Sequence, residues 1–236
     1  MAGTPLAVTP ATKVICCGHN YRAHIEEMGH GLPRFPTLFT KFADTLTGPD
    51  DDIVVPAFAA DSIDWEAELA VVVGSPLRHA DRAAARDGIA GYTVANDISI
   101  RSWQRQTGQW LPGKAFAKTT PVGAEVVDVD PAAGLRIQCR VNGETVQSAR
   151  TDDLLFDAAD LLVHITAFTP LRPGDIVLTG TPSGVGAARD PQRFLAEGDV
   201  VETEIESIGL LRNTIRVDPI DHPQLAGDHR TREEAR

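Results

Sequence analysis

Cysteines are few in this chain of 236 residues, and long apolar segments are missing. The three cysteines are Cys16, Cys17 and Cys139, and two of them are adjacent. An odd count that includes neighbours does not suit the disulfide framework of a small secreted domain. We therefore expect small buried thiols in a reducing compartment. No stretch approaches about 18 consecutive apolar residues, so the sequence predicts no membrane-spanning segment.

Positive charge is also scarce. Lys and Arg total 22 against 33 Asp and Glu, which gives a formal net charge of −11 at pH 7. Proteins that bind nucleic acids need basic surface for the phosphates, so this balance argues against a nucleic-acid partner. Residues 1–12 include Pro and Thr and lack the apolar core of a secretory signal. These observations lead us to expect a cytoplasmic protein.

The remaining composition is that of an ordinary globular protein, with 42% apolar and 23% charged residues. Repeats, low-complexity segments and dividing linkers are not found. We expect one domain over residues 1–220 and a charged, frayed tail over residues 221–236. Residue patterns predict many strands and a few short helices. The predicted strands cover 13–18, 37–42, 53–56, 64–74, 89–99, 121–127, 135–141, 145–147, 176–179 and 200–208, and the predicted helices cover 20–29, 81–88 and 157–166. Asn142-Gly143 is a type I′ hairpin signal, and an Asp begins each of the last two helices. We expect the acidic face of 200–208 to be solvated.

The most informative stretch is residues 64–74, where an apolar and largely β-branched run ends at a Gly-Ser-Pro turn. Glu66 and Glu68 lie two residues apart and therefore point to the same face of the strand. Two carboxylates this close repel each other unless a proton or a cation lies between them, and hard divalent cations prefer oxygen ligands. The alternative is an exposed strand end with solvated carboxylates. A Glu-x-Glu motif on its own favours that alternative.

A second apolar run, residues 89–95, is followed by a polar pair that includes Asp97. This strand delivers a third carboxylate to a strand end, where it could complete a metal site with the two glutamates. Arg101 and Gln104 follow at a spacing of three. That spacing places both side chains on one face of a helical turn.

Two further segments offer groups for an anion. Lys114 follows a flexible glycine. The Gly-rich loop over residues 180–186 is neither a P-loop nor a dinucleotide fingerprint. Such a loop can still present backbone N–H groups and Thr181 to a carboxylate.

His24 and Glu27 lie three residues apart in the predicted helix 20–29, which Asn20 could cap and Gly29 could end. On a helix this spacing brings both side chains to one face. A histidine beside a carboxylate is the usual makeup of a general base with an orienting partner. A surface His–Glu pair is equally consistent with the pattern. The Gly- and Pro-rich residues 29–36 that follow are typical of a loop that closes over a site.

Several separated stretches together resemble the fumarylacetoacetate hydrolase family over about residues 14–215. The matching motifs are Gly18-x-Asn20-Tyr21-x-x-His24-x-x-Glu27, Asp64-Trp65-Glu66-x-Glu68-Leu69-Ala70, Gly91-Tyr92-Thr93-x-x-Asn96-Asp97-x-Ser99-x-Arg101-x-x-Gln104, Gly113-Lys114-x-Phe116, Val141-Asn142-Gly143-Glu144, Pro173-Gly174-Asp175-x-x-x-Thr179-Gly180-Thr181-Pro182-x-Gly184-Val185-Gly186 and Gly198-Asp199-x-Val201. So many motifs in one order are far more specific than any single one.

The resemblance implies a mostly β (α+β) fold, a mixed β-roll of several sheet layers with a few short helices, and a homodimer. It also implies a Mg²⁺ or Mn²⁺ ion held by Glu66, Glu68 and Asp97. Three carboxylates with open positions beside them suit Mg²⁺, which takes about six oxygen ligands.

The family's substrates carry a 2-keto acid or its enol, whose oxygens chelate the metal. Arg101, Gln104 and Thr181 match family positions around that head group. The resemblance further implies that Lys114 stabilises the enolate as it forms. It implies that His24 and Glu27 activate water.

Three positions depart from the family's usual pattern. Ser102 and Ala117 stand where the family often has Asp, and this affects hydrogen bonds that orient the substrate-binding groups. His19 replaces a more usual Arg or Leu, and we interpret it as a packing residue.

These residues lead to the hypothesis of a Mg²⁺- or Mn²⁺-dependent hydrolase that cleaves the C–C bond of an acylpyruvate-type β-diketo acid through a metal-chelated enolate. Isomerisation or decarboxylation of 2-hydroxyhepta-2,4-diene-1,7-dioate, and decarboxylation of oxaloacetate, are alternatives because they share the enolate. From another class, the chain could be a catalytically inactive protein that binds the metal and a keto acid. In each case the expected partner is a small anionic 2-keto or β-diketo acid.

Overall fold

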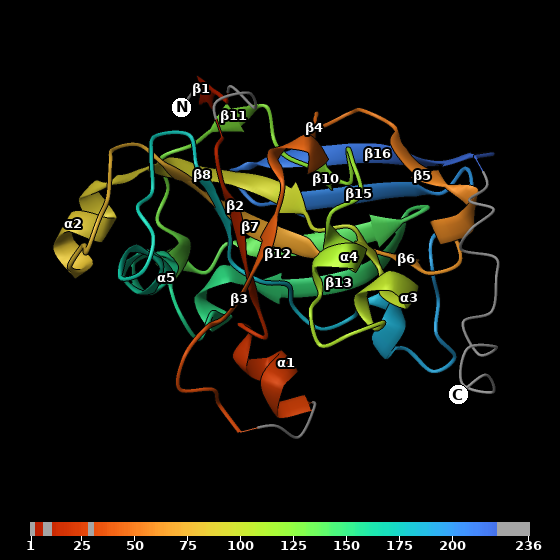
Figure 1. Cartoon of the computed structure of the whole chain (residues 1–236), viewed down its shortest axis with the longest axis horizontal. Coiled ribbons are helices and arrows are strands. Elements are labelled where there is room, and N and C mark those ends of the chain that lie inside the picture. Colours follow the sequence, from red (N-terminus) through yellow and green to blue (C-terminus); the bar gives the residue numbers. More distant parts are fainter. Residues whose placement is uncertain (1–2, 7–10, 28–30, 221–236) are drawn as a thin grey trace, which may run out of the picture.

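Strands dominate the computed structural model of the chain, which describes residues 3–6, 11–27 and 31–220 (Figure 1). The strands are β1 Thr4–Pro5, β2 Val14–Gly18, β3 Thr37–Lys41, β4 Leu46–Thr47, β5 Ile53–Pro56, β6 Ile63–Asp64, β7 Ala67–Val73, β8 Ile89–Asn96, β9 Ser99–Ile100, β10 Thr120–Pro121, β11 Glu125–Val126, β12 Arg136–Val141, β13 Glu144–Arg150, β14 Ile176–Leu178, β15 Val200–Ile205 and β16 Gly209–Asp218. The helices are α1 Arg22–Glu27, α2 Arg82–Asp87, α3 Arg101–Gln104, α4 Leu111–Lys114 and α5 Ala158–Thr166. The predicted tail over residues 221–236 and the predicted helix end at Gly29 lie outside the described residues.

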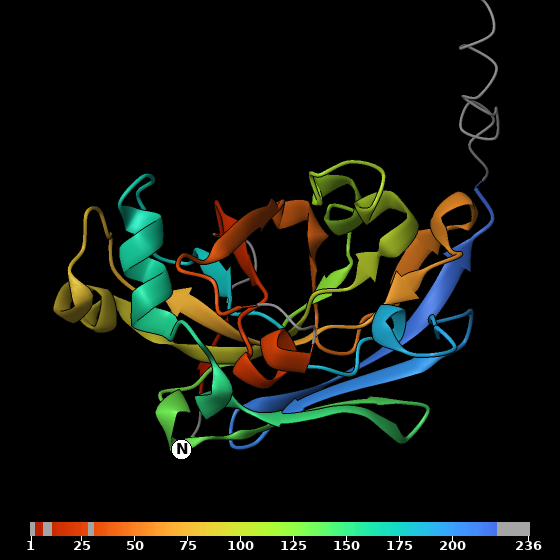
Figure 2. The same ribbon diagram turned by 90° about the horizontal axis from the view of Figure 1, so that it is seen from below.

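Two five-stranded sheets form the body of the fold. One has the strand order β13-β12-β15-β16-β5, and the other has the order β3-β2-β14-β7-β8. Figure 2 places β12, β13, β15 and β16 in one layer, with β7 and β8 in the layer above it. These features confirm the expected mostly β (α+β) fold with several sheet layers and short helices. Among the described helices, none has the length and hydropathy needed to cross a membrane.

Strand β7 is buried along its whole length because it packs on both faces. Leu69, Val71 and Val73 belong to the larger hydrophobic cluster, between the two sheets. Ala70 belongs to a second cluster on the opposite face, together with Cys16 of β2. A strand buried on both faces reads as a continuous apolar run, which explains why this segment does not alternate. Alternation still orients its side chains, so the two glutamates share a face with Ala70.

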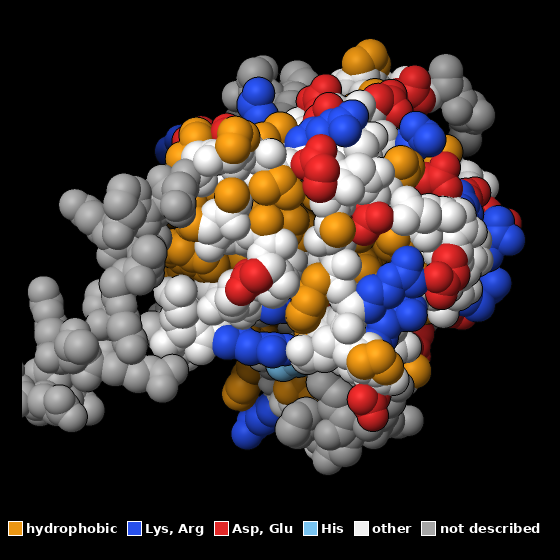
Figure 3. Space-filling view, turned by 90° about the vertical axis from the view of Figure 1, so that its right-hand side faces the viewer, with side chains coloured by type: hydrophobic (Ala, Val, Ile, Leu, Met, Phe, Trp, Pro, Cys, Tyr) orange, Lys and Arg blue, Asp and Glu red, His pale blue; other side chains and the backbone are white. Residues whose placement is uncertain are grey.

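The turn and cap signals of the sequence are confirmed. Asn142 and Gly143 have φ angles of 52° and 82°, as a type I′ hairpin requires, and they join β12 to β13. Asp81 and Asp157 cap α2 and α5 through side chains that accept backbone N–H groups. On the face drawn in Figure 3, the described acidic and basic side chains are interspersed, with apolar side chains between them.

The predicted strand over residues 121–127 is wrong as a single element. Its first residue, Pro121, belongs to β10, which pairs with β4. Residues 125–126 near its end form β11, which pairs with β1. Between them Gly123 donates its N–H to Val94 C=O at 2.8 Å. A Cβ at Gly123 would lie 2.4 Å from Thr93 Oγ1. This close approach to β8 divides the segment.

The acidic face of β15 is not simply solvated, contrary to expectation. Arg140 on the neighbouring strand β12 lies 3.2 Å from Glu202 and 2.9 Å from Glu204. Opposite charges on adjacent strands stabilise the pairing of those strands. The glutamates on this face therefore contribute to the sheet.

Asn20 does not cap α1, contrary to expectation. It is fully buried, and its Nδ2 donates to the carbonyls of Phe156 at 2.9 Å and Thr179 at 2.7 Å. Its Oδ1 accepts the N–H of Phe156 at 2.8 Å. At the start of α1, Asp153 accepts the N–H of Ala23 instead. Asn20 thus ties the segment before α1 to the end of β14.

We predict that Asn20→Ala lowers the free energy of unfolding by about 2–4 kcal/mol, because one buried and two half-buried backbone groups lose their partner. Urea denaturation measures the change. Asn142→Gly is the matched control, since it keeps the left-handed turn and removes two exposed hydrogen bonds. We expect it to cost less than about 1 kcal/mol. Equal losses in the two variants would contradict the role given to Asn20.

Candidate active site

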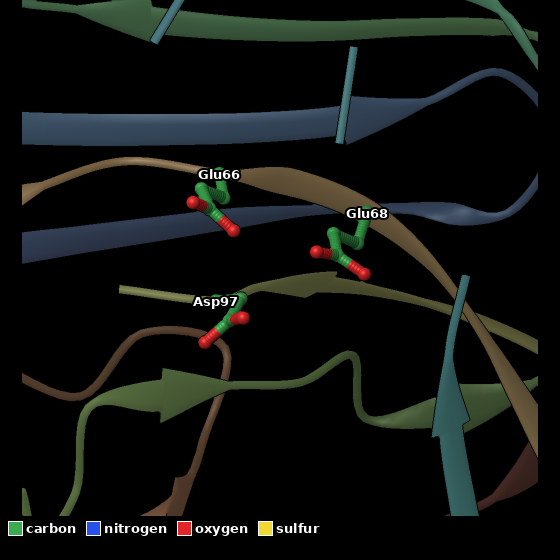
Figure 4. A group of neighbouring side chains, drawn as sticks. All are labelled: Glu66, Glu68 and Asp97. Carbon is green, nitrogen blue, oxygen red and sulfur yellow. The ribbon is translucent and has the colours of Figure 1, made fainter. Parts of the chain in front are cut away.

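The three predicted metal ligands meet where β7 begins and β8 ends. Glu66 precedes β7, Glu68 is its second residue and Asp97 directly follows β8. The strands pair antiparallel, and Asp97 N–H donates to Glu66 C=O at 2.9 Å. One carboxylate oxygen from each residue lies within 4.8 Å of the other two, and Figure 4 shows the side chains turned toward a common space. All three are buried, so the alternative of a solvated strand end is wrong.

Three cations surround this carboxylate cluster of Glu66, Glu68 and Asp97. Lys114 Nζ lies 2.9 Å from Glu66 Oε2 and 2.7 Å from Asp97 Oδ2. Arg101 Nη2 lies 2.7 Å from Glu66 Oε1. Lys41 Nζ lies 2.6 Å from Asp97 Oδ1, and both of these side chains are fully buried.

Lys41 was not among the predicted site residues. Its sequence signal is weak, because it is one lysine at the end of the predicted strand 37–42. A lysine is almost never fully buried unless it is paired. The structure shows that the partner of Lys41 is Asp97, and the sequence gives no sign of this pair.

The cations act unequally on the carboxylate cluster. Burial favours the neutral form of Asp97, but Lys114 and Lys41 outweigh burial and hold its pKa below the usual value. Burial raises the pKa of Glu68 well above its usual value, and the charges of Asp97 and Glu66 add to this rise. Glu68 accepts the N–H of Gly180 at 2.7 Å but forms no salt bridge within the described part of the chain. It is the member of the cluster without a cation of its own.

The donor set fits a hard divalent cation. Carboxylate oxygens are the ligands that Mg²⁺ and Mn²⁺ prefer. Together with Asp64, the cluster makes four buried carboxylates, and they face the three cations Lys41, Arg101 and Lys114. Counted as ionised, the four carboxylates exceed the three cations by one negative charge. This excess lies at Glu68, which is why its pKa is raised while no further cation is present. The residues present thus suit the divalent metal that the resemblance implies.

Arg101 and Gln104 lie on one turn, α3, as predicted. Arg101 Nε donates to Asp64 Oδ2, and its Nη1 donates to Gln104 Oε1, both at 2.8 Å. Burial disfavours the guanidinium charge, yet Glu66 and Asp64 together raise the pKa of Arg101 above its usual value. The sequence alone indicates no role for Asp64. Because Asp64 also accepts the N–H of Gly186 at 2.6 Å, it fixes both α3 and the Gly-rich loop.

Thr181 is held at the site by a residue that the sequence did not single out. Gln147 Nε2 donates to Thr181 Oγ1 and to Pro182 C=O, both at 2.8 Å. Gln147 Oε1 accepts the N–H of Ala67 at 2.9 Å. This buried glutamine connects the Gly-rich loop to β7.

A cavity of about 440 Å³ opens onto the carboxylate cluster. Its volume is in the range of sites for small ligands. Phe39 and Trp110 form apolar parts of its wall, and Lys114 Nζ lies 4.9 Å from the centre of the Phe39 ring. The predicted site residues that line it are Glu66, Glu68, Arg101, Gln104, Lys114 and Thr181. Asp97 is not in this wall.

Helix α1 carries His24 and Glu27 at the predicted spacing. Their side chains lie outside the described part of the structure, so their role stays a prediction. His19, just before this helix, lines the cavity with a φ angle of 54°. Its ring meets Trp110 edge-on, with centroids 5.6 Å apart. This contact agrees with the packing role expected of His19 and places that packing in the cavity wall.

A carboxylate is present beside Ser102 although that position itself lacks one. Ser102 Oγ donates to Asp61 Oδ1 at 2.8 Å. Ser62 Oγ donates to the same Asp61 oxygen at 2.9 Å and accepts the N–H of Ser102. Asp61 therefore orients the start of α3. Ala117, the other departure, is exposed.

Cys17 lines the cavity but is not a nucleophile at neutral pH. Burial, with a contribution from Glu68, raises the pKa of Cys17 to about 12. Because the thiolate is the reactive form, this residue stays inert. Cys16 and Cys139 are also buried and free, as expected.

Residues 13–216 match the fumarylacetoacetate (FAA) hydrolase C-terminal family model. This chain belongs to that family. It is 44% identical over 212 residues to the mitochondrial oxaloacetate tautomerase Fahd2a of Rattus norvegicus, covering 88% of this chain and 67% of the rat protein. It is also 44% identical over 213 residues to the mitochondrial oxaloacetate tautomerase FAHD2A of Homo sapiens, covering 88% of this chain and 68% of the human protein.

Solved structures agree with this assignment. A 5-carboxymethyl-2-hydroxymuconate delta-isomerase from Mycobacterium smegmatis has a TM-score of 0.82 and 39% identity, covering 92% of this chain and 83% of that one. A fumarylacetoacetate hydrolase from psychrophilic Exiguobacterium antarcticum has a TM-score of 0.83 and 35% identity, covering 89% of this chain and 76% of that one. The names of these relatives include both isomerases and a hydrolase.

We predict that Lys41→Met lowers the free energy of unfolding by about 3–5 kcal/mol, because it removes one partner of a buried ion pair. Lys13→Met is the matched control. Lys13 pairs with Asp175 at 3.4 Å, its side chain is 28% exposed, and Asp175 keeps other donors. We expect the control to cost less than about 1 kcal/mol in urea denaturation. Similar losses in both variants would mean that Lys41 does not compensate Asp97.

Proposed function

We propose that this chain is a divalent-metal-dependent enzyme that interconverts the keto and enol forms of a small 2-keto acid, with oxaloacetate as the best candidate. The proposal depends on one observation above all. The Lys114 ammonium lies between Glu66 and Asp97 at the wall of a small cavity. The relatives named as oxaloacetate tautomerases support the choice of reaction and substrate.

Glu66, Glu68 and Asp97 would hold the ion, with Mg²⁺ or Mn²⁺ favoured by their oxygen donors. When bound, such an ion polarises a keto oxygen as a Lewis acid and so acidifies the neighbouring C–H bond. Glu68 has no cationic partner in the described part of the chain. A carboxylate without a compensating cation is suited to bind a metal ion, and this supports its place in the ligand set.

Lys114 is suited to stabilise negative charge on the substrate oxygen. An ammonium has three N–H donors, and Glu66 and Asp97 accept two of them. The third is available to an oxygen in the cavity. Burial works against the charge of Lys114, but Asp97 and Glu66 raise its pKa above the usual value. A fixed charge in a buried site stabilises an enolate far better than water does.

Gln104 and Thr181 are suited to bind the carboxylate of the substrate. Gln104 Oε1 already accepts from Arg101, so its NH₂ group is oriented as a donor. Thr181 Oγ1 accepts from Gln147, which leaves its own O–H to donate. Both residues line the cavity. Two donors on the wall can hold the head group while the carbon beside the keto group reacts.

Tautomerisation requires that one proton move between the substrate oxygen and the carbon beside the keto group. We propose that His24, oriented by Glu27, transfers this proton. Supporting this, α1 begins at Arg22, only a short way along the chain from Gly18 and His19, which line the cavity.

Acylpyruvate hydrolysis, the reaction expected from the sequence, is the second candidate. The similarity to the Exiguobacterium fumarylacetoacetate hydrolase favours it. It needs the same enolate but also a water activated for attack on the far carbonyl. The inactive binder predicts metal and keto-acid binding without turnover. The homodimer implied by the resemblance stays a prediction.

We predict that the wild-type protein with Mg²⁺ accelerates the loss of enol absorbance from enol-rich oxaloacetate, and that EDTA abolishes this effect. In Lys114→Met we expect kcat to fall by about 10²–10³-fold, because one donor to the developing charge is removed. Lys118→Met, an exposed lysine on the same segment, is the control and should keep wild-type turnover. Circular dichroism verifies that both variants fold.

The same assay discriminates between the candidate functions. Turnover of acylpyruvates but not of oxaloacetate would select the hydrolase. An absence of turnover for all these substrates with Mg²⁺ and with Mn²⁺ would overturn the enzyme proposal in favour of the binder. Undiminished turnover by Lys114→Met would remove this lysine from the reaction.

We predict that Mg²⁺ or Mn²⁺ raises the Tm of the wild-type protein and that Glu68→Gln removes this response. Glu68 is the preferred variant because it forms no salt bridge in the described residues, so its loss should leave the metal-free fold intact. Glu202→Gln on the face of β15 is the control and should respond as wild type. If Glu68→Gln and wild type respond to the ion alike, the proposed metal site is wrong.

A further inference from the structure

Arg105 is a cavity residue whose charge no carboxylate of the described residues compensates. Lys114 and Arg101 also line the cavity, but both are neutralised by buried carboxylates. Arg105 is exposed, and its guanidinium has neither a salt bridge nor a side-chain hydrogen bond among the described residues. An arginine on a cavity wall that lacks an internal partner is available to an anionic group of a ligand.

We propose that Arg105 binds the second, distal carboxylate of a 2-keto dicarboxylic acid and so selects diacids over 2-keto acids with a neutral tail. The inference rests on the proposed function, because it assigns the substrate class for that same site. Arginine is well matched to this task because its planar guanidinium can donate two parallel hydrogen bonds to one carboxylate.

The position of Arg105 relative to Arg101 supports this assignment. Arg105 directly follows α3, and its N–H donates to Arg101 C=O at 3.1 Å. Residues four apart on a helical turn lie on one face, with Cβ atoms about 5–6 Å apart. Asp64 and Glu66 clamp Arg101 beside the carboxylate cluster. Arg105 is therefore held about one turn farther from the cluster, on the same side.

This displacement suits a four-carbon diacid. Its two carboxyl carbons are separated by three bonds, a span of about 3.8 Å when extended, as between consecutive Cα atoms. A head group bound at Gln104 and Thr181 would thus place the distal carboxylate within reach of a long arginine side chain. Apart from Lys114, whose charge Glu66 and Asp97 compensate, the residues after Arg105 that line the cavity are uncharged, among them Thr107, Trp110 and Val185.

The charges of the site lead to the same conclusion. Counted as ionised, the four buried carboxylates of the site exceed the three buried cations of the described residues by one negative charge. A divalent ion would turn this into one positive charge, which a single substrate carboxylate balances. A second carboxylate needs one more cation, and Arg105 supplies it from the cavity wall.

The test compares Arg105→Gln and Arg105→Lys with the wild-type protein, and Arg212→Gln on β16 is the matched arginine control. For oxaloacetate with Mg²⁺, we expect Arg105→Gln to raise KM about tenfold or more with little change in kcat, as loss of a charge-assisted hydrogen bond implies. Arg105→Lys should recover part of the loss because it keeps the charge. KM for acetylpyruvate, which has a neutral tail, should not rise.

Binding provides a readout that does not depend on turnover. Calorimetry with Mg²⁺ should show that Arg105→Gln binds oxalate, which represents the head group alone, as tightly as wild type. The same variant should bind oxaloacetate about tenfold more weakly. Equal weakening for both ligands, no weakening for oxaloacetate, or no binding of oxaloacetate by wild type would overturn the inference.

The two proposals fail separately. If wild type binds oxaloacetate through Arg105 but turns over no substrate, the proposed function fails and the diacid site stands. If wild type turns over oxaloacetate and Arg105→Gln has an unchanged KM and affinity, the diacid site fails and the proposed function stands.

Discussion

The contact of the Lys114 ammonium with Glu66 and Asp97 is the interaction on which the site depends. Carboxylates this close repel one another, and burial removes their hydration. Both effects destabilise the ionised cluster unless nearby cations compensate its charge. The three cations come from separate elements, since Lys41 ends β3, Arg101 begins α3 and Lys114 ends α4. Packing of these elements near β7 and β8 therefore brings in the cations that neutralise the cluster. The fold positions the site, and the charges of the site in turn stabilise the packing of β3, α3 and α4.

The two-sided burial of β7 explains why the cluster is placed where it is. One face of the strand packs in the core between the sheets, and the other belongs to the second hydrophobic cluster, with Leu46 and Val122. The antiparallel register brings the start of β7 against the end of β8, so carboxylates from distant parts of the sequence converge. A rigid strand pair holds them more accurately than loops would, as a metal site requires.

Much of this could be predicted from the sequence, because the responsible signals are local. Spacing of two on a strand placed Glu66 beside Glu68, and a polar end to an apolar run identified Asp97. Spacing of three placed Arg101 with Gln104. Asn-Gly predicted the hairpin after β12 because few residues adopt its left-handed angles.

What could not be predicted depends on partners far apart in the chain. Lys41 meets Asp97 56 residues away, and Gln147 meets Ala67 80 residues away. No period or spacing indicates such pairs. For Asn20, distant partners made a local prediction wrong. Its local pattern indicates a helix cap, but three hydrogen bonds to residues more than a hundred positions away determine its place.

The carboxylate cluster and Lys114 do not themselves choose among the reactions considered, because tautomerisation, decarboxylation and C–C hydrolysis all develop negative charge on the same oxygen. Selection must come from groups over the far end of the substrate. We propose His24 and Glu27 on α1, and Arg105 just after α3, for this selection. Among the described residues, Arg105 lies outside the network of buried salt bridges. Arg105 can therefore change without leaving a buried charge unpaired, whereas Lys41, Arg101 and Lys114 cannot. In this chain, the group that meets the far end of the substrate can thus be altered without disturbing the charged centre.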